Sequence, residues 1–360
     1  MNIFLIEILK MNIKLTQLPN LIPKINLKNS RILSSKENEV PYVFDIVSTS
    51  SICVASTSDQ EFFWWNYNND SLGKFSYHTD TITKLKIHKN HLLISSSKDG
   101  CIAIWDLRAS KVEPAQILLA PNREPLLSFD INSSDTILAA GTELVEKTEI
   151  DEAETDEADE TDAKIFFWDL RNASSIEAQF IKSHNDDITQ IQFHPSCSSR
   201  FISGSVDGLI CSFDIKNFDE DEELVGVINS GSSINKAGYF GSNGEYVYCL
   251  THTETFSIWG SSEGDMLSNL GDIRQDSSDS IAQIDYAIDC QFDYSSNRLF
   301  LFAGSYAGEV NVLHVDVNNL QLCQTLCGGH SEIIRSVFWN PQTNLFLTGG
   351  EDAKLCLWGP

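Results

Sequence analysis

The sequence predicts an all-β fold in which seven similar four-stranded units close into a β-propeller. Seven hydrophobic runs along the 360 residues end in tryptophan or in a substitute for it, at positions 65, 105, 168, 213, 259, 313 and 358. Their spacings are 40, 63, 45, 46, 54 and 45 residues, and the longest interval contains a twenty-residue acidic stretch whose removal leaves 43. A repeat of about 45 residues is the length of one propeller blade. The clearest copies also read as strand, turn, strand.

An acidic turn residue precedes the end of four of these runs by six positions. The four pairs are Asp59 and Trp65, Asp99 and Trp105, Asp207 and Phe213, and Asp352 and Trp358. Trp168 and Trp259 end two further runs, and a degenerate copy puts Leu313 at the corresponding position. The segments 101–107 and 164–170 each contain a continuous apolar run that ends in Trp, which is typical of strands covered on both faces. We therefore expect these strands to pack between neighbouring blades.

Closure of the ring requires a strand from outside the last repeat. The sequence ends two residues after Trp358, at the third strand of the seventh unit. The first and last blades must be joined to keep the ring from opening, so we expect residues 28–35 to supply the missing strand. The propeller then spans residues 28–360. Residues 1–27 form an N-terminal extension with no assigned place in the ring, because two prolines in it disfavour a continuing strand.

Polar residues repeat with the same period as the tryptophans. In the clearest copies a Ser or Thr lies four residues before the turn Asp, a His lies further upstream, and the dipeptide Trp-Asp occurs at 105–106 and 168–169. This pattern, over about residues 29–360, resembles the WD-repeat family. Residues 165–172 and 232–259 are similar to the WD repeat-containing protein 89 group. The resemblance implies a seven-bladed WD-repeat β-propeller and little about function, because the group is named for its fold.

The resemblance also implies a buried hydrogen-bond network of His, Ser or Thr, the turn Asp and the Trp indole. Carried over to this sequence, the network is complete in two blades and lacks the indole donor in a third, where Phe213 replaces Trp. The residues are His78, Ser95, Asp99 and Trp105; His330, Thr348, Asp352 and Trp358; and His184, Ser203 and Asp207.

Ser, His and Asp are also the elements of a nucleophilic triad. A catalytic set would stand alone in one cleft, whereas this set recurs at blade spacing, so we predict that the protein is not an enzyme. The other histidines are dispersed over different repeats, and the single Cys-x3-Cys pair at 323 and 327 is weak evidence for zinc. The sequence has no Gly-x4-Gly-Lys-Ser/Thr phosphate loop. We therefore expect no cofactor and no bound metal.

Composition indicates an acidic protein of the cell interior. Hydrophobic residues make up 42% of the sequence, the net charge is −26, and nine cysteines occur singly, as in a reducing compartment. The N-terminus is a poor signal peptide, and nothing spans a membrane. We expect a monomeric propeller, cytoplasmic or nuclear or both, with no membrane association. Direct nucleic-acid binding is disfavoured because phosphates would be repelled.

An acidic insert interrupts the third repeat. Residues 143–162 contain eleven acidic residues and one lysine, which is −10 of the net −26. So much like charge with so few apolar residues predicts a disordered loop between the second and third strands of the third blade. A shorter acidic run, residues 219–223, is expected to follow the fourth blade at its outer connection. The insert is either a solubilising spacer or a docking tail for a basic partner protein, which would indicate a chaperone or assembly role.

The function we expect is a scaffold that presents a ring face to other proteins, because loops on a rigid frame usually carry recognition residues. Family geometry places contact residues near the start of each first strand and just before the turn Asp. Arg335 is the foremost candidate, because Arg is enriched at interface hot spots. The full set is Thr81, Thr83, Lys98, Asp187, Thr189, Val206, Ile333, Arg335 and Glu351.

An alternative function is that of a substrate receptor for a cullin-based ubiquitin ligase. Many WD-repeat receptors of that class contain the tetrapeptide Trp-Asp-x-Arg, which occurs here at 105–108 and 168–171. Arg108 and Arg171 would then contact the adaptor. The tetrapeptide is short and is also common in propellers without that role, so the scaffold and receptor interpretations both remain open.

Overall fold

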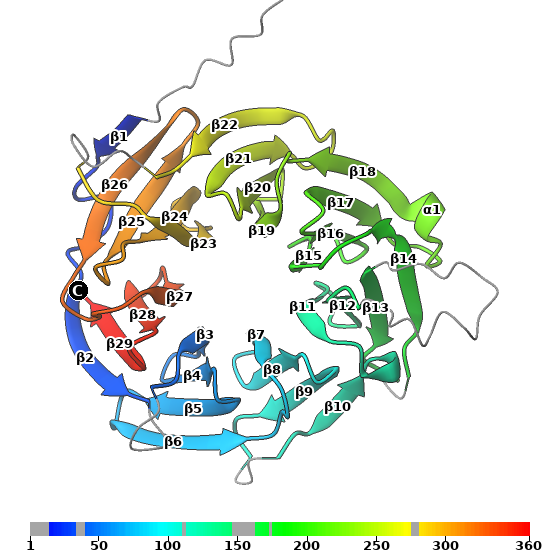
Figure 1. Ribbon diagram of the computed structural model, residues 1–360, viewed down its shortest axis with the longest axis horizontal. Helices are drawn as coiled ribbons and strands as arrows, with labels where there is room; N and C mark the ends of the chain where they lie inside the picture. Colours follow the sequence, from blue (N-terminus) through cyan, green and yellow to red (C-terminus); the bar gives the residue numbers. More distant parts are fainter. Residues whose placement is uncertain (1–13, 34–39, 110–112, 146–162, 173–174, 275–280) are drawn as a thin grey trace, which may run out of the picture.

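The computed structural model describes residues 14–33, 40–109, 113–145, 163–172, 175–274 and 281–360. These residues form seven β-sheets, which are arranged as blades around a central channel (Figure 1). In every blade the first strand is innermost and the later strands follow outward. The predicted all-β, seven-bladed propeller is confirmed. The described residues contain no helix long and apolar enough to cross a membrane.

The first three blades are each continuous in the chain. Blade one contains β3 (Val43–Ser48), β4 (Ile52–Thr57), β5 (Glu61–Asn66) and β6 (Ser71–Ser76). Blade two contains β7 (Ile82–His88), β8 (Leu92–Ser97), β9 (Cys101–Asp106) and β10 (Gln116–Leu119), and the short turn η1 (Pro121–Arg123) follows it. Blade three contains β11 (Leu126–Ile131), β12 (Ile137–Thr142), β13 (Ala163–Asp169) and β14 (Ala178–His184).

The last four blades include the two segments that come from the N-terminus. Blade four contains β15 (Gln190–Phe193), β16 (Arg200–Gly204), β17 (Leu209–Asp214) and β18 (Leu224–Asn229), with the helix α1 (Glu220–Glu223). Blade five contains β19 (Ile234–Phe240), β20 (Tyr246–Thr251), β21 (Thr255–Gly260) and β22 (Met266–Asp272). Blade six contains β23 (Tyr286–Asp293), β24 (Arg298–Gly304), β25 (Val310–Asp316), β26 (Asn319–Leu326) and β1 (Lys14–Gln17). Blade seven contains β27 (Ile334–Asn340), β28 (Leu345–Gly350), β29 (Lys354–Gly359) and β2 (Asn26–Ile32).

The hydrophobic core lies between the blades. One cluster joins Val54 and Phe62 of blade one to Leu93 and Trp105 of blade two, and all four side chains are buried. Each predicted end residue of a run lies in the third strand of its blade and is buried: Trp65, Trp105, Trp168, Phe213, Trp259, Leu313 and Trp358. Burial of apolar surface between sheets is the main stabilising contribution to such a fold, so each blade depends on its two neighbours.

The ring is closed by an N-terminal strand, as the sequence predicts, but β2 covers Asn26–Ile32 rather than residues 28–35, of which 34 and 35 lie outside the described residues. Strand β2 pairs antiparallel with β29, and Leu27 lies opposite Trp358. After β2, the Leu33 backbone N–H donates to Ala353 O at 2.7 Å, and the Leu33 side chain is fully buried in the cluster between blades seven and one. The first and last parts of the sequence thus share one sheet.

An ionic contact joins the closing strand to blade one. Arg31 of β2 forms an ion pair with Asp70, which lies between β5 and β6. The Trp65 indole N–H donates to the same carboxylate at 3.0 Å, and the Arg31 guanidinium lies 5.5 Å from the centre of a Trp65 ring. The third strand of blade one is therefore connected to the outer strand of blade seven.

The structure differs from the sequence expectation in the segment before the closing strand. Residues 14–17 form β1, which pairs in parallel with β26 and gives blade six a fifth strand. Ile22 and Ile25 are buried in the cluster between blades six and seven, and the Gln324 side chain bonds to both backbone groups of Ile25. Because β1 ends before the first proline of this segment, the prolines do not prevent the pairing.

The two acidic segments lie in different places. The segment 143–162 connects β12 to β13 as expected, but residues 146–162 lie outside the described residues. The run 219–223 is inside blade four, between β17 and β18, rather than after that blade, and it forms α1. Its Glu220 carboxylate accepts the Ile181 N–H at 2.7 Å and the Lys182 N–H at 2.9 Å. These N–H groups belong to the outer strand of blade three, so Glu220 covers part of that free edge.

The polar set of blade two forms a continuous hydrogen-bond network. His78 Nε2 lies 2.8 Å from Ser95 Oγ, His78 Nδ1 lies 3.0 Å from Asp99 Oδ2, and the Trp105 indole donates to Ser95 Oγ at 3.2 Å. All these bonds are satisfied when the His78 ring proton is on Nδ1 and the Ser95 hydroxyl donates to Nε2. Burial works against ionisation of Asp99, but the bonds from His78 and the Thr79 N–H outweigh it and lower the pKa of Asp99.

Blades seven and four show the complete and the shortened form of this network. In blade seven the distances are 2.7, 2.9 and 2.8 Å for the pairs His330–Thr348, His330–Asp352 and Trp358–Thr348. In blade four the His184–Ser203 and His184–Asp207 distances are 2.7 and 2.9 Å. The Phe213 side chain has no N–H, so the Ser203 hydroxyl has one partner where that of Ser95 has two.

The closing segment allows a test with two neighbouring residues. Leu33→Ala should lower the free energy of unfolding by about 2–5 kcal/mol, because it leaves a cavity between the first and last blades. Ile32→Ala should change it by less than about 0.5 kcal/mol, because Ile32 is 68% exposed whereas Leu33 is 0% exposed. Urea unfolding of both variants measures the difference. Equal effects would show that residue 33 does not join the blades.

The networks of blades two and four allow the same substitution in two settings. Ser95→Ala removes the partner of two buried nitrogen atoms, the Trp105 indole nitrogen and His78 Nε2, whereas Ser203→Ala removes only that of His184 Nε2. Ser95→Ala should therefore destabilise the protein by about 1 kcal/mol more than Ser203→Ala. Both hydroxyl residues are fully buried, so the two cavities are comparable. Chemical unfolding with the native protein as reference decides the point, and a larger effect at Ser203 would contradict it.

Candidate functional site

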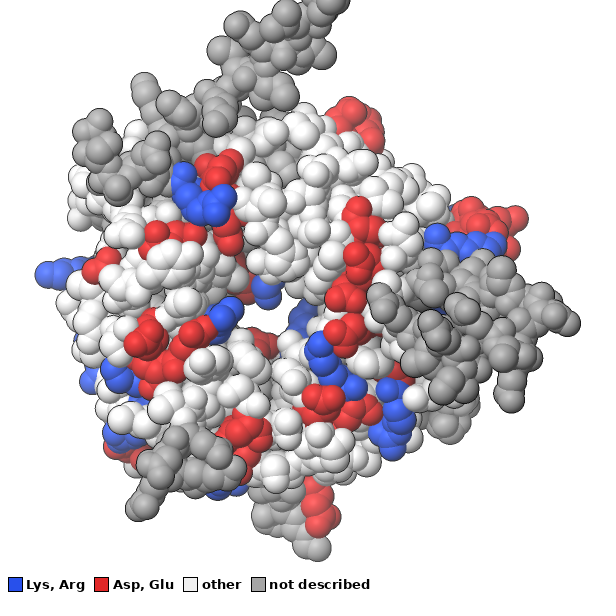
Figure 2. All heavy atoms as spheres, in the orientation of Figure 1, with Lys and Arg blue, Asp and Glu red and all other residues white. Residues whose placement is uncertain are grey.

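The order of the strands sends the connections of each blade alternately to two faces of the ring. One face carries the turns between second and third strands and the connections from blade to blade. We call it the insert face, because residues 143–162 connect two strands there. The other, which we call the opposite face, carries the remaining turns. Figure 2 shows one face of the ring, with acidic side chains in patches around an open channel.

The insert face is acidic even without the residues of the insert that lie outside the structural description. The described basic residues in its loops are Lys98, Arg123 and Arg274. The described acidic residues in the same loops are Asp59, Asp80, Asp99, Glu124, Glu143, Asp186, Asp187, Asp207, Glu254, Asp285, Glu309, Glu332, Glu351 and Asp352. The charge of this face therefore matches that of the insert.

Two of the predicted contact residues hold the start of the insert. Lys98, in the turn of blade two, pairs with Glu143 at 2.6 Å, and the Leu144 N–H donates to Asp187 of blade four at 2.8 Å. Burial raises the pKa of Asp187, and the charge of Glu143 adds to this rise, while the Leu144 N–H opposes it. The chain thus leaves blade three from a position fixed by the blades on either side.

Arg335 and Glu351 lie together in blade seven. Arg335 Nε donates to Glu351 Oε1 at 2.7 Å, and half of the Arg335 side chain is exposed. Arg335 also lines the central channel. Arg335 therefore lies where a loop of the insert face borders the channel.

The three predicted threonines are less available. The Thr83 hydroxyl donates to Leu126 O and the Thr189 hydroxyl donates to Ile234 O, both at 2.8 Å and both across to the next blade. Thr81 is half-buried, and its carbonyl accepts the Lys98 N–H at 3.0 Å. Val206 and Ile333 take part in similar backbone bonds between turn and connection, Val206 N to Asp187 O and Glu351 N to Ile333 O. The hydroxyls of Thr83 and Thr189 therefore join blades.

Arg108 and Arg171 lie on the opposite face and fold back onto their own repeats. Each guanidinium binds the carboxylate two residues earlier, Arg108 on Asp106 and Arg171 on Asp169, with Nε to Oδ1 distances of 2.9 Å. The same geometry, also at 2.9 Å, joins Arg274 to Asp272 in a segment that has no Trp. The Asp-x-Arg contact is therefore a local turn that does not depend on the preceding Trp.

The central channel contains charged residues that the sequence analysis did not single out. It has a volume of about 800 Å³ and is lined by the innermost strands, including Asp45, Lys84, Lys236 and Asp289. Each of these residues lies two positions after a buried apolar residue at the start of its strand. That spacing is a signal in the sequence, but it shows only when the first strands are aligned with one another.

Aspartates of the channel wall also link neighbouring blades. Asp45 Oδ2 accepts the Leu85 N–H of blade two at 2.7 Å, and Asp130 Oδ2 accepts the Phe193 N–H of blade four at 2.8 Å. Burial raises the pKa of Asp45, although Lys236 and the bound N–H groups oppose the rise. The wall is thus a set of contacts between blades as well as a polar surface.

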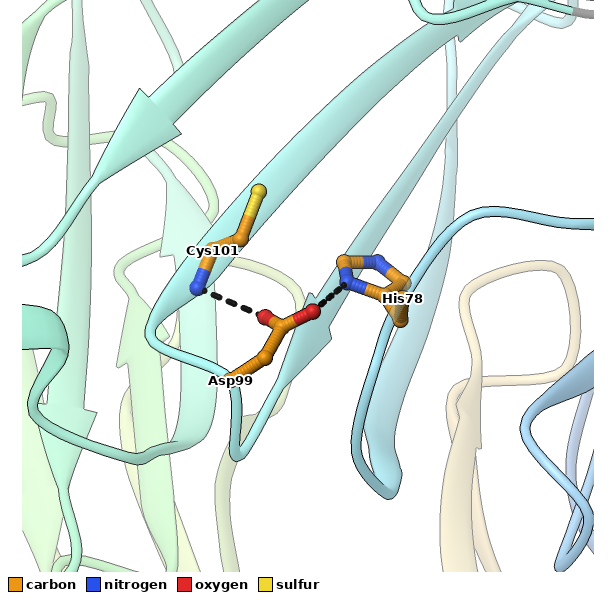
Figure 3. A group of neighbouring side chains, drawn as sticks. All are labelled: His78, Asp99 and Cys101. Atoms are coloured by element: carbon orange, nitrogen blue, oxygen red, sulfur yellow. Dashed lines mark hydrogen bonds and ion pairs between the residues drawn. The ribbon is translucent and has the colours of Figure 1, made fainter.

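His78, Asp99 and Cys101 are the group in the described residues with metal-ligand chemistry (Figure 3). His78 and Asp99 already bond to each other, and the Cys101 N–H donates to Asp99 Oδ1 at 3.0 Å. Burial, with the charge of Asp99, raises the pKa of the Cys101 thiol to about 11, whereas a metal binds the thiolate. This group is accounted for by the blade network.

One further pattern has the spacing of a hydrolase nucleophile motif. Residues 260–264 read Gly-Ser-Ser-Glu-Gly, which fits Gly-x-Ser-x-Gly. They form the turn between β21 and β22 rather than a strand-to-helix elbow, and Ser262 is exposed. The described residues place no His beside the Ser262 hydroxyl. The geometry of a nucleophile elbow is therefore not found at this turn.

Comparison with known proteins agrees with the repeats seen in the structure. The family model "WD domain, G-beta repeat" matches residues 69–106, 176–214 and 321–359. Each match begins near the outer strand of one blade and ends with the third strand of the next. The unit that repeats in the sequence is therefore offset from the blade by one strand. For the same reason the last repeat ends at the third strand of blade seven, and β2 supplies the outer strand.

The similarity extends over nearly the whole chain. A WD repeat-containing protein 89 homolog of Dictyostelium discoideum is 31% identical over 346 residues, which cover 94% of this chain and 89% of the relative. WD repeat-containing protein GTS1 of Arabidopsis thaliana is 30% identical over 356 residues, which cover 94% of this chain and 85% of the relative. With seven blades, the repeated polar networks and these relatives, the chain belongs to the WD-repeat family, and it is similar within that family to WD repeat-containing protein 89.

Proposed function

We propose that this WD-repeat protein is an intracellular, non-enzymatic scaffold that binds protein partners through its insert face, and that the partner segment it recognises is basic. WD-repeat propellers generally bind other proteins. The observation that carries the finer proposal is the acidic insert, whose first residues are held by Lys98 and Asp187 on a face that is itself acidic. An attached acidic segment of this kind attracts a basic partner from a distance and raises the association rate.

The compartment is part of the same proposal. All nine cysteines are free thiols, and Cys53, Cys101, Cys211, Cys249, Cys290, Cys323 and Cys356 are buried. Burial raises the pKa values of these buried thiols, for example that of Cys53 to about 12, so they favour packing over thiolate chemistry. Free thiols in these numbers support a reducing environment, as in the cytoplasm or the nucleus.

Removing the charge of the insert should weaken binding of a basic ligand. In this variant every Glu and Asp of residues 146–162 is replaced by Gln or Asn, while Glu143 and Leu144 are kept because they are bonded to the ring. A lysine-rich peptide of about 20 residues should bind at least about tenfold more weakly to the variant, and the difference should shrink as salt rises. Fluorescence anisotropy at two salt concentrations measures both effects.

The matched control removes acidic charge from the opposite face. Asp221 and Glu222 of α1 are changed to Asn and Gln in the native background, and peptide binding should stay within about twofold of the native value. Glu220 and Glu223 are left unchanged, because Glu220 binds backbone N–H groups of blade three and Glu223 is buried. The insert variant removes ten carboxylates and the control removes two, so the losses are compared per charge removed. If they are equal on that basis, the effect belongs to net charge and the insert face has no special role.

The ring face itself is tested at Arg335. Arg335→Ala should reduce the amount of partner protein that co-purifies with the intact chain, because it removes a half-exposed guanidinium at the mouth of the channel, which would contact a part of the partner other than its basic segment. The control is Arg108→Ala with Arg171→Ala, since these exposed arginines lie on the opposite face and are also paired with a carboxylate. Quantitative mass spectrometry compares the variants. Loss of a cullin adaptor in the control would instead favour the ligase-receptor function.

A further inference from the structure

The charged residues of the channel wall occupy equivalent positions in different blades. In six blades the pairing of the first two strands shifts register after the first buried residue, and one residue then follows the shift. In ring order from blade one, with blade four left out, these residues are Asp45, Lys84, Ser128, Lys236, Asp289 and Ser336. At this position the channel wall therefore carries lysines in blades two and five and carboxylates in blades six and one.

The two lysines lack the partners that their neighbours have. Neither Lys84 nor Lys236 has a carboxylate oxygen within 4.0 Å among the described residues, whereas Lys86 pairs with Asp130. The Lys84 ammonium has one distant acceptor, Ile191 O at 3.5 Å, and lies 5.8 Å from the centre of the Phe129 ring. Within the part of the chain that the structure describes, the Lys236 ammonium donates no hydrogen bond. Six N–H donors in the channel thus have at most one long bond between them.

The carboxylates of the same wall are better satisfied. Asp45 accepts the Ile46 and Leu85 N–H groups at 2.8 and 2.7 Å. Asp130 accepts the Ile131 and Phe193 N–H groups, both at 2.8 Å, and pairs with Lys86, while Asp289 accepts the Cys290 N–H at 2.8 Å. Asp45 and Asp130 thus bond through both carboxylate oxygens, and Asp289 bonds through one. Among the described residues, most of the unused hydrogen-bonding capacity of the wall is therefore on the two lysines.

The two ammonium groups also influence each other. Burial lowers the pKa of Lys84 to about 8, Asp130 opposes this, and repulsion by Lys86 and Lys236 adds to it. The charge of Asp289 raises the pKa of Lys236 in spite of its burial. Both amines are therefore cations at neutral pH, and Lys84 is the one that a bound negative charge would stabilise most.

We infer that the central channel binds a small oxyanion, a phosphate or carboxylate group, between the ammonium groups of Lys84 and Lys236. Charge-assisted bonds from two ammonium groups are the usual means of holding such a group. Gln192 adds a donor in the same channel, because its Oε1 accepts the Tyr239 N–H at 2.5 Å and its amide N–H groups remain for a ligand. The channel volume of about 800 Å³ leaves space for an organic group attached to the oxyanion. This inference is independent of the proposed binding of basic partners.

The oxyanion has two sources that share this chemistry, a free small molecule and the carboxylates of residues 146–162. Isothermal titration calorimetry with inorganic phosphate, on the full chain and on the variant with a neutralised insert, distinguishes them. Tighter phosphate binding after neutralisation would support the site and identify the insert as a competitor for it. Equal binding would support the site with a free anion as its ligand. Absence of phosphate binding to both proteins at millimolar concentration would overturn the inference.

Substitutions locate the site. Lys84→Met and Lys236→Met should each weaken phosphate binding at least about tenfold, since each removes a charge-assisted donor. Lys74→Met is the control, because Lys74 of the outer strand β6 is paired with Glu61 outside the channel, and it should leave the affinity unchanged. If the methionine variants bind phosphate as the native chain does, the anion lies elsewhere and the inference is wrong.

A measurement on the native protein guards against variants that fail to fold. In NMR spectra of protein with 13C-labelled lysine Cε atoms, phosphate should shift the Lys84 and Lys236 signals and leave that of Lys74 in place. The double variant Lys84→Arg with Lys236→Arg keeps both charges and should keep phosphate binding within about tenfold of native. Shifts at Lys74 alone, or none at the two channel lysines, would overturn the inference.

Discussion

No blade of this propeller can bury its own two faces, and every other feature depends on that constraint. The apolar clusters lie between adjacent sheets, so a blade is stable only between two neighbours. Six of the seven contacts between neighbours follow from the order of the chain. The seventh, between blades seven and one, requires β2 to pair with β29 and Leu33 to fill the space beside blade one. A single strand near one end of the chain thus determines whether the ring exists.

Features that repeat with the blades could be predicted from the sequence. The repeat period predicted the third-strand end residues and the polar residues of blades two, four and seven. The missing fourth strand of the last repeat predicted the closing strand. Features that occur once could not be predicted in this way. Strand β1 forms by pairing with the free edge of β26, and nothing in residues 14–17 themselves indicates that pairing. Glu220 covers backbone groups 38 and 39 positions away, and nothing in the acidic run 219–223 indicates that contact.

The residues of the candidate site also divide into those that repeat with the blades and those that occur once. Thr83 and Thr189 are in equivalent positions and make equivalent bonds to the next blade, so their residue type is explained by the ring. Lys98 and Asp187 hold a segment that only blade three possesses, and the ring does not require them to do so. The channel lysines are intermediate, because their position is periodic and their charge is not. Alignment of the first strands would reveal the positions, but the lack of a nearby carboxylate is visible only in three dimensions.

The acidic insert face and the channel lysines act on ligands at different distances. With a net charge of −26 and an acidic insert face, the protein repels a polyanion at distances where individual side chains are not sensed. At physiological ionic strength this field decays over about 8 Å, so it acts on large ligands that meet many charges at once and much less on a small ion. The ammonium groups of Lys84 and Lys236 lie inside the channel wall, beyond the reach of a duplex or a rigid surface. A negative ligand that reaches them must therefore be small or narrow, whereas a basic protein is attracted by the whole face. If both proposals hold, the same molecule discriminates by the sign of a ligand's charge at its rim and by ligand size at its centre.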